Sequence, residues 1–436
     1  MSVMWVKDAH LDDYAEAQDI LIEDGKIALV GPAGTLPGER ADEVLHCAGS
    51  AVLPGFVEAH LHLDKALLDE RMPNLAGNLE GAIKVTGALK SRFTMDDVME
   101  RARKVLDMAI AQGTTVIRTQ PDVDPIVHTL GVDAMLALRD EYRGLIDLQV
   151  VAFPQEGIIK APGTVDLLEE CLLNGADVVG GCTYNESDVE TCKEHIRQVF
   201  DLAEKHDVPV DMHCDFQVDA SDPRYALVEH IADVTIERGM QGRVTLGHMT
   251  SLASLSGHHR VEVWDRIKQA ELNIVVLPFT DMHLNARNDD HDVRRGVAPV
   301  KLMWDVDINV GLSSNNVRNA FTPFGNADLM DVALFLAQVG HMGTPDDFRR
   351  LLRTITYANA KIVGVNDGYG LKVGDRADLV VLDAPNGPAG LLDRAVRTAV
   401  IKGGRIVART TKTTELFKNV PSWVALNNPQ ETSTDA

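Results

Sequence analysis

The chain has 436 residues, of which 45% are hydrophobic, 25% charged and 5% aromatic, values that match an ordinary soluble globular protein and exclude disorder, collagen and coiled coil. Its formal net charge at neutral pH is −23. Because such an acidic surface repels phosphate backbones and anionic lipids, we expect neither a nucleic acid nor a membrane as partner.

The N-terminal segment, MSVMWVKDAHLDD, has neither the basic region nor the apolar region of a secretory signal peptide. No run in the chain reaches the roughly 18 apolar residues that a membrane-spanning helix needs. The five cysteines are scattered and form no CxxC pair, so neither a disulfide framework nor a zinc knuckle is indicated. We therefore expect a cytoplasmic protein that is not exported and does not cross a membrane.

Both ends of the chain carry the pattern of β-hairpins. Residues 19–31, DILIEDGKIALVG, alternate apolar and polar side chains around the turn Asp24-Gly25. Near the C-terminus, residues 377–382 and 399–407 are further β-rich runs, and the second contains a Gly-Gly turn. We predict that the two ends of the chain meet in one small β-sandwich-like domain.

The middle of the chain alternates short apolar runs with helical stretches such as Met95–Ala111. The first apolar run lies within residues 54–65, and the later ones are 115–118, 147–153, 178–180, 208–213, 243–248, 273–277 and 307–312. About eight strands, each followed by a helix, are what a parallel barrel requires. We therefore predict an α/β fold, a (β/α)8 TIM-like barrel whose active site lies at the C-terminal ends of the strands, where the polar residues cluster.

The predicted domains follow from where these patterns begin and end. The small β-domain takes residues 1–52 and 365–415, and the catalytic barrel takes residues 53–364. Residues 416–436 form a C-terminal tail, whose last part, NNPQETSTDA, has the polar composition of a disordered segment.

The clearest chemical signal is PGFVEAHLHLDK, residues 54–65, an apolar strand that ends in two histidines one residue apart. Alternate side chains of a strand share a face, so His60 and His62 can place two imidazole nitrogens on one metal ion. His213 and His248 close two later strands and reach the same mouth of the barrel. A lone buried histidine is usually only a hydrogen-bonded core residue, but four at strand ends indicate a site that binds Zn or Fe and activates a water molecule.

Several segments spread over nearly the whole chain carry a recognisable pattern. They are DILIEDGKI, PGFVEAHLHLDK, RTQPDVD, VVAFPQEG, DMHCDF, GRVTLGHMTS, HLNARNDDHDVRRGV, VRNAFTPFGNADL and YGLKVGDRADLVVLD. On these segments the chain resembles the amidohydrolase superfamily, and within it the cytosine deaminase-like branch, which includes the isopropylammelide amidohydrolases. PGFVEAHLHLDK and GLKVGDRADLVVLD are specific for the superfamily, whereas VAFPQEG and HxNxR followed by RRG point to the branch.

The resemblance implies one divalent metal ion per chain, Zn or Fe, in a mononuclear site without a carboxylated lysine. Its ligands would be His60, His62 and His213. His248 would activate or polarise the attacking water, and Gln155 would read the substrate ring.

The chain departs from the family at four places. The family's fourth metal ligand, an aspartate that also accepts the proton of the water, is replaced by Asn315, and the proton-shuttling glutamate of cytosine deaminases is replaced by Phe216. Gln120 stands where the branch commonly has a histidine, and Phe321 where a tryptophan commonly closes the pocket. Asn315 can still bind a cation through its carbonyl oxygen, but it brings no charge and cannot accept a proton.

Proton transfer therefore needs another group. His248 is the first candidate for the general base, because imidazole titrates near neutrality. Asp215 follows His213 by two residues and should share its face of the strand, which makes it the second candidate. The alternative role of Asp215 is to orient a ligand histidine.

We expect the substrate to contact Gln155, Phe216 and Phe321. His283 and Arg287, on a loop after strand seven, are candidates to clamp an anionic or carbonyl group of the substrate. The alternatives are a loop-organising amide for Gln155 and a solvated charged loop for His283 and Arg287.

These residues lead to two hypotheses. The first is a metal-dependent hydrolase that cleaves a C–N bond in a small cyclic nitrogenous compound, as a deaminase or cyclic amidohydrolase, by attack of metal-bound hydroxide on an sp² carbon. The second is a catalytically weak or inactive homologue that binds a metabolite, because Asn315 and Phe216 replace the family carboxylates. Both predict a small-molecule ligand, and we expect the chain to form a homo-oligomer.

Overall fold

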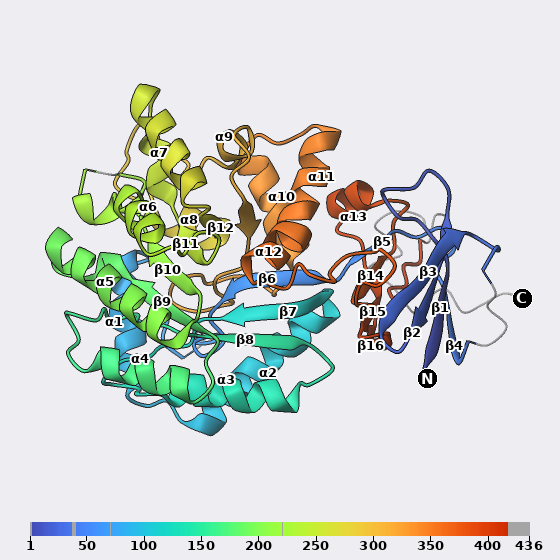
Figure 1. Cartoon of the computed structure of the whole chain (residues 1–436), viewed down its shortest axis with the longest axis horizontal. Coiled ribbons are helices and arrows are strands. Elements are labelled where there is room, and N and C mark those ends of the chain that lie inside the picture. Colours follow the sequence, from blue (N-terminus) through green and yellow to red (C-terminus); the bar gives the residue numbers. More distant parts are fainter. Residues whose placement is uncertain (1, 37–40, 70, 220, 417–436) are drawn as a thin grey trace, which may run out of the picture.

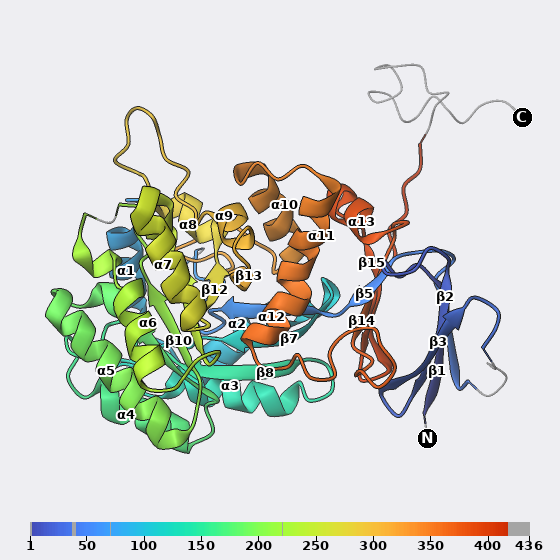
Figure 2. The same ribbon diagram turned by 45° about the horizontal axis from the view of Figure 1, so that its top comes forward.

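A computed structural model describes residues 2–36, 41–69, 71–219 and 221–416 of the chain. Figures 1 and 2 show a large barrel surrounded by helices and, beside it, a smaller part built of β-strands from both ends of the chain. Of the predicted tail, 416–436, only the first residue lies within the described residues. No helix within the described ranges is long and apolar enough to cross a membrane.

The barrel is one sheet of eight parallel strands in the order β13-β12-β11-β10-β9-β8-β7-β6. The strands are β6 (Phe56–Leu61), β7 (Thr114–Thr119), β8 (Asp147–Ala152), β9 (Val178–Cys182), β10 (Val210–Cys214), β11 (Val244–His248), β12 (Asn273–Val276) and β13 (Val310–Leu312). All 6 residues of β6 and all 5 of β10 are buried, as expected of strands covered on both faces. Each predicted apolar run overlaps one of these strands.

The first and last strands of the barrel meet at the candidate site. Leu61 and Asn315 form a parallel bridge, in which the Asn315 backbone N–H donates to the carbonyl of His60 at 3.0 Å. The backbone N–H of His62 donates in turn to the carbonyl of Asn315 at 2.8 Å. The backbone that closes the barrel therefore also brings Asn315 next to the two histidines.

Helices cover the barrel. They are α1 (Leu79–Lys90), α2 (Met95–Ala111), α3 (Leu130–Glu141), α4 (Thr164–Leu173), α5 (Val189–His206), α6 (Val228–Glu237), α7 (Gly257–Gln269), α8 (Pro278–Leu284), α9 (Val300–Trp304), α10 (Leu329–Val339), α11 (Pro345–Arg353), α12 (Asn359–Ile362) and α13 (Gly387–Asp393). In α5, Asp188 caps the N-terminus, and buried apolar residues recur at helical spacing at Ile196, Val199, Phe200 and Ala203. The predicted helix over 95–111 matches α2.

Two four-stranded sheets make up the smaller part. One has the order β3-β2-β1-β4 and the other β16-β15-β14-β5. Their strands are β1 (Val3–Ala9), β2 (Gln18–Glu23), β3 (Lys26–Pro32), β4 (Glu43–His46), β5 (Val52–Pro54), β14 (Leu379–Leu382), β15 (Arg397–Lys402) and β16 (Arg405–Arg409). Val6, Ile20, Val52, Leu379 and Ile401 lie in one buried cluster, so residues from both ends of the chain share a core. The predicted fold class, a barrel with a small β-domain from both termini, is confirmed.

Both predicted hairpins are present. Asp24 and Gly25 have φ angles of 48° and 80°, and Gly403 and Gly404 have 53° and 73°, the left-handed values that a two-residue hairpin turn needs. The domain limits at residues 52, 364 and 415 stay a prediction.

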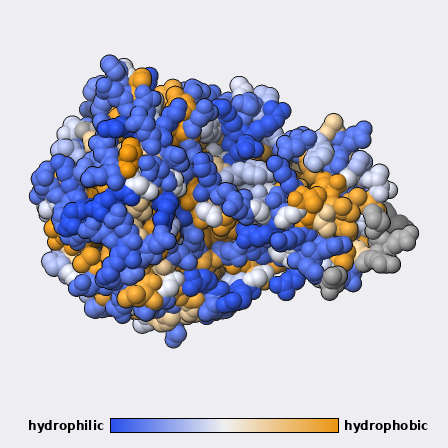
Figure 3. Space-filling model, in the orientation of Figure 1, coloured by the Kyte–Doolittle hydropathy of each residue, from blue (hydrophilic) through white to orange (hydrophobic). Residues whose placement is uncertain are grey.

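Figure 3 shows a face that is mostly hydrophilic, with apolar side chains gathering over the sheets formed by the chain ends. Leu29 in β3 and Val44 in β4 are among the exposed apolar side chains of these sheets.

Candidate active site

Three histidine side chains converge at the C-terminal end of the barrel strands. His60 lies in β6, His62 directly follows it, and His213 lies in β10; all three are buried. The Nε2 atom of His213 lies 3.0 Å from the Nε2 atom of His60 and 3.0 Å from that of His62. Among the residues that the structure describes, this is the only group of three or more His, Cys, Asp or Glu side chains close enough to hold a metal ion.

Groups behind two of these histidines turn the Nε2 atoms toward one another. Nδ1 of His62 donates to the backbone carbonyl of Gln120 at 2.7 Å, which leaves a lone pair on its Nε2. Nδ1 of His60 lies 3.8 Å from Oδ1 of Asp211, whose other oxygen accepts a hydrogen bond from Arg118 at 2.9 Å. A carbonyl or carboxylate behind the imidazole is the usual surrounding of a metal-binding histidine.

These donors fit a divalent metal ion. Burial, reinforced by neighbouring cationic groups, lowers the pKa of all three histidines well below its ordinary value, so they present neutral nitrogens. The Oδ1 atom of Asn315 is buried without a hydrogen-bond partner, and Asn315 lines the same cavity. A metal ion bound by the three imidazoles would give this unpaired carbonyl oxygen a partner.

His248, at the end of β11, is paired with a buried carboxylate. Its Nδ1 atom lies 2.6 Å from Oδ1 of Asp281, and Oδ2 of Asp281 accepts the backbone N–H of Leu277 at 3.2 Å. Because a carboxylate only accepts, Nδ1 carries the proton and Nε2 keeps a lone pair. The ring centroid of His248 lies 5.3 Å from that of His213, so this base candidate stands beside the metal site.

The structure places Asp215 away from the cavity. Its carboxylate accepts the backbone N–H groups of Leu227 at 3.0 Å and of Val228 at 3.2 Å, at the start of α6. Strand β10 ends at Cys214 and Asp215 has a left-handed φ of 47°, so the alternation that should put it on the face of His213 has already ended. This placement does not support the catalytic role predicted for Asp215.

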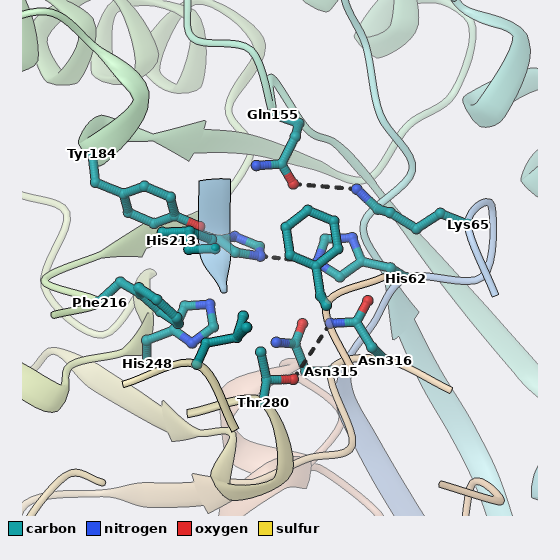
Figure 4. Close-up of a pocket in the computed structure, with 13 residues that line it drawn as sticks. His62, Lys65, Gln155, Tyr184, His213, Phe216, His248, Thr280, Asn315 and Asn316 are labelled. Carbon is teal, nitrogen blue, oxygen red and sulfur yellow. Dashed lines mark hydrogen bonds between the residues drawn. The ribbon is translucent and has the colours of Figure 1, made fainter. Parts of the chain in front are cut away.

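The cavity beside the histidines is small and is lined by both polar and apolar side chains. It is lined by His62, Lys65, Leu79, Gln155, Tyr184, His213, Phe216, His248, Thr280, Leu284, Asn315, Asn316 and Phe321. Figure 4 shows how ten of these side chains surround it. Its free space measures about 10 Å³, room for about one water molecule, so a ring compound can enter only when lining side chains move.

Three of the predicted substrate-binding residues reach the cavity. Gln155, Phe216 and Phe321 all line it. The ring of Phe216 meets that of His248 edge to face, with 4.7 Å between centroids, and lies 5.6 Å from the ring of Tyr184. Where cytosine deaminases carry a glutamate, the cavity therefore has an aromatic wall.

The other two predicted substrate-binding residues lie outside the cavity. His283 is half-buried, and its ring packs against Phe324 at 5.4 Å between centroids. Arg287 is exposed and donates to the backbone carbonyl of His283 at 3.0 Å. The structure does not bring these two residues together with the histidine cluster.

Two residues of the site carry chemistry that the sequence reasoning missed. Asp281 follows the seventh barrel strand within VVLPFTD, and its place just after a strand end was the available signal. Lys65 follows His62 by three residues, lines the cavity and pairs with the buried carboxylate of Asp122. Its position inside the PGFVEAHLHLDK segment was the feature of the sequence that could have pointed to it.

The fold and the site define a barrel of eight parallel strands whose C-terminal ends carry a histidine cluster close enough to hold a metal ion, at the face where such barrels build their active sites. Residues 43–408 match the Amidohydrolase family, and the chain belongs to this family.

Similar proteins span nearly the whole chain. N-isopropylammelide isopropyl amidohydrolase of Pseudomonas sp. (strain ADP) is 30% identical over 411 residues, which cover 93% of this chain and 96% of that protein. The structure of 5-methylcytosine deaminase from Klebsiella pneumoniae with 5-fluorocytosine has a TM-score of 0.90 at 29% identity and covers 95% of this chain and 99% of its own. That of N-isopropylammelide isopropylaminohydrolase from Burkholderia multivorans has a TM-score of 0.81 at 30% identity and covers 94% and 99%.

Proposed function

We propose that the chain is a metal-dependent hydrolase that cleaves a C–N bond in a small cyclic nitrogenous compound, as a deaminase or cyclic amidohydrolase. The observation that carries this proposal is that the Nε2 atoms of His60 and His62 each lie 3.0 Å from that of His213, beside the oriented imidazole of His248. The relatives support it, since by their names they act on N-isopropylammelide and 5-methylcytosine.

His60, His62 and His213 would hold the ion, with the carbonyl oxygen of Asn315 as a fourth, neutral ligand. Three imidazoles and an oxygen suit Zn or Fe. The bound ion would lower the pKa of a water molecule and stabilise the negative charge that develops during attack on an sp² carbon.

His248 is the group that moves the proton. Asp281 holds the Nδ1–H, so Nε2 accepts the proton of the attacking water and can deliver it to the leaving nitrogen. Asn315 cannot take this role, because an amide accepts no proton at neutral pH. The pair of His248 and Asp281 is thus the substitute for the family aspartate.

The aromatic wall limits the substrate. Cytosine itself is disfavoured, because Phe216 stands where a carboxylate would protonate the ring nitrogen. A less polar or N-alkylated ring, or an amide whose leaving group needs less assistance, fits a cavity lined by Phe216 and Phe321 better.

Asn315 and Phe216 also motivate a second candidate, a catalytically weak or inactive homologue that binds a metabolite at the same cavity. Catalytic turnover distinguishes the hydrolase from the inactive homologue.

The test is release of ammonia or amine by the metal-loaded protein from a panel of pyrimidines, triazines, hydantoins and N-substituted amides. We expect turnover of at least one ring compound and its loss in His248→Ala, with His258→Ala, an exposed histidine on α7, as matched control.

No turnover of any ring compound by the wild type would contradict the hydrolase and favour the binding protein. Full activity in His248→Ala would keep the hydrolase but contradict the role of His248 as the base. Formation of a homo-oligomer stays a prediction, which sedimentation of the purified protein checks.

A further inference from the structure

A second cavity lies where the strands from the chain ends meet the barrel, at the β5 end of the small sheets (Figure 2). It is lined by the loop 11–14 after β1, by residues 53–54 of β5, by α11 with the turn that follows it, and by residues 371–372. Its volume is about 460 Å³, against about 10 Å³ beside the histidines, and the two cavities have none of the described lining residues in common. We call it the junction cavity; its size and its place between two structural units are typical of small-molecule sites.

The inner surface of the junction cavity is apolar. Leu11, Leu53 and Leu352 line it and are 1%, 6% and 4% exposed. Tyr14 lines it from the loop after β1 and is 44% exposed. A ring that enters therefore exchanges water for aliphatic and aromatic contacts.

The cations of the junction cavity have no carboxylate partner. Arg349, Arg353 and Lys372 line it, and across the described ranges of the chain no carboxylate lies within ion-pair distance of any of them. Carboxylates are plentiful in this chain, which has 65 acidic and 42 basic residues. Three cations left without one at the same cavity indicate an anionic ligand.

Arg353 is held in a way that suits a carboxylate. Its guanidinium lies over the ring of Tyr357, 4.8 Å from the centroid. This stacking occupies a face of the guanidinium and leaves the N–H groups in its plane for the two oxygens of a carboxylate. Tyr357 is itself fixed, because its ring meets that of Tyr369 edge to face at 5.6 Å, and the Tyr369 hydroxyl donates to the carbonyl of Gly55 at 2.8 Å.

The helix that carries Arg353 is irregular at this point. α11 continues directly into the π-helical turn Thr354–Ala358, two residues of which line the junction cavity. Such turns inside α-helices are frequent at functional sites. The next residue, Asn359, donates to the carbonyls of Val57 at 2.6 Å and of Leu312 at 2.8 Å. This wall of the cavity is therefore anchored on the barrel strands β6 and β13.

Two carboxylates limit the charge of the ligand. Asp12 and Asp13 line the same cavity, and Asp12 accepts the backbone N–H of Gly387 at 3.2 Å. Three cations against two carboxylates leave an excess of one positive charge. This excess matches a singly charged carboxylate, whereas a doubly charged phosphate is repelled more strongly by the two aspartates.

We propose that the junction cavity is a second ligand site, which binds a planar aromatic ring that carries a single carboxylate. Arg353 binds the carboxylate, Arg349 and Lys372 add positive charge, and the ring packs on Leu53 and Leu352. The site is separate from the histidine cluster, so it does not depend on the proposed hydrolase.

The experiment measures binding of three matched naphthalene compounds to the metal-loaded protein by calorimetry. They are 2-naphthoate, which carries one charge, the neutral 2-naphthamide, and 2-naphthyl phosphate at a pH at which it carries two charges. We expect 2-naphthoate to bind about tenfold more tightly than the amide, because only the carboxylate forms charge-assisted hydrogen bonds with Arg353. The phosphate should bind more weakly than 2-naphthoate.

Variants assign the binding to the junction cavity. Arg353→Met should lower the affinity for 2-naphthoate about tenfold and leave that for the amide nearly unchanged, because it removes the charge and keeps an apolar side chain. Arg92→Met, an exposed arginine between α1 and α2, is the matched control and should bind 2-naphthoate as the wild type does. His213→Ala, which removes a metal-ligand candidate, should also keep the wild-type affinity.

Four results would overturn the inference. They are no binding of 2-naphthoate by the wild type, equal affinity for 2-naphthoate and the amide, tighter binding of the phosphate, and unchanged affinity for 2-naphthoate in Arg353→Met. Loss of 2-naphthoate binding in His213→Ala would assign the compound to the histidine site and overturn the inference as well.

Discussion

The contact of His248 with Asp281 offers a sharp test of the mechanism through Asp281→Asn. The two oxygens of Asp281 accept from two donors, Nδ1 of His248 at 2.6 Å and the backbone N–H of Leu277 at 3.2 Å. An asparagine has only one oxygen for these two places. Its nitrogen must face either the imidazole or the backbone N–H, and in each orientation one contact becomes donor against donor.

The backbone N–H of Leu277 cannot change, whereas an imidazole can move its proton to the other nitrogen. A buried donor left without an acceptor costs about 1–3 kcal/mol, so we expect the asparagine to keep its oxygen on Leu277 and its nitrogen on His248. Nδ1 of His248 then becomes the acceptor and Nε2 carries the proton. An imidazole in this tautomer cannot take a proton from the attacking water.

We expect Asp281→Asn to lower kcat by about 10² to 10⁴, which corresponds to about 3–5 kcal/mol of activation free energy. The assay is steady-state turnover of a substrate found in the ring-compound panel, with metal content measured in parallel. Metal content should stay at the wild-type level, because Asp281 contacts none of the three ligand histidines. The exposed Asp265→Asn on α7 is the matched control. A kcat close to that of the wild type in Asp281→Asn would refute the argument.

Three further predictions concern the metal site and stability. His213→Ala should lose the bound ion, which metal analysis checks, because the Nε2 of His213 is the atom that lies 3.0 Å from both other ligand nitrogens. Asn315→Asp should keep the ion, bind it more tightly and move the lower limb of the pH–rate profile to lower pH, because it adds a charge and a proton acceptor. Hydrogen bonds from Thr344 and Gly343 outweigh burial and lower the pKa of Asp347 to about 2, so its stabilisation is present above about pH 4 and is lost as the pH falls through 2. Asp347→Asn should therefore cost about 1 kcal/mol of unfolding free energy at pH 7 in denaturant titrations, and less at pH 2.5.

The sequence was sufficient for the parts of the site that depend on strand periodicity. His60 and His62 share a face because side chains alternate along β6, and the ends of parallel strands bring His213 and His248 to the same mouth. The same rule failed for Asp215, because a strand's last residue is set by backbone angles that the apolar pattern does not reveal. One residue beyond Cys214, the chain has already turned.

Other parts depend on how loops fold back, which no local pattern predicts. Asp281 reaches His248 because the segment after β12 becomes the short helix α8. Gln120 stands where the branch commonly has a histidine, and the sequence suggested no role for it. In the structure its backbone carbonyl accepts a hydrogen bond from His62 at 2.7 Å, and its Oε1 accepts one from the Leu61 N–H at 2.9 Å, so Gln120 positions the end of the first barrel strand. Only the contacts between strand ends make this role visible.

These contacts place negative charge one layer behind the cavity. Asp211 lies behind His60, Asp281 behind His248, and Asp122 behind Lys65. Asp281 holds the proton of His248 on Nδ1, so that this base presents a lone pair on Nε2, and Asp122 forms an ion pair with Lys65. The family carboxylates that Asn315 and Phe216 replace would do this work at the cavity surface. A protein that only binds a metabolite has no need of an imidazole whose tautomer is fixed by a buried charge, and this is the physical ground on which the hydrolase is preferred to an inactive homologue.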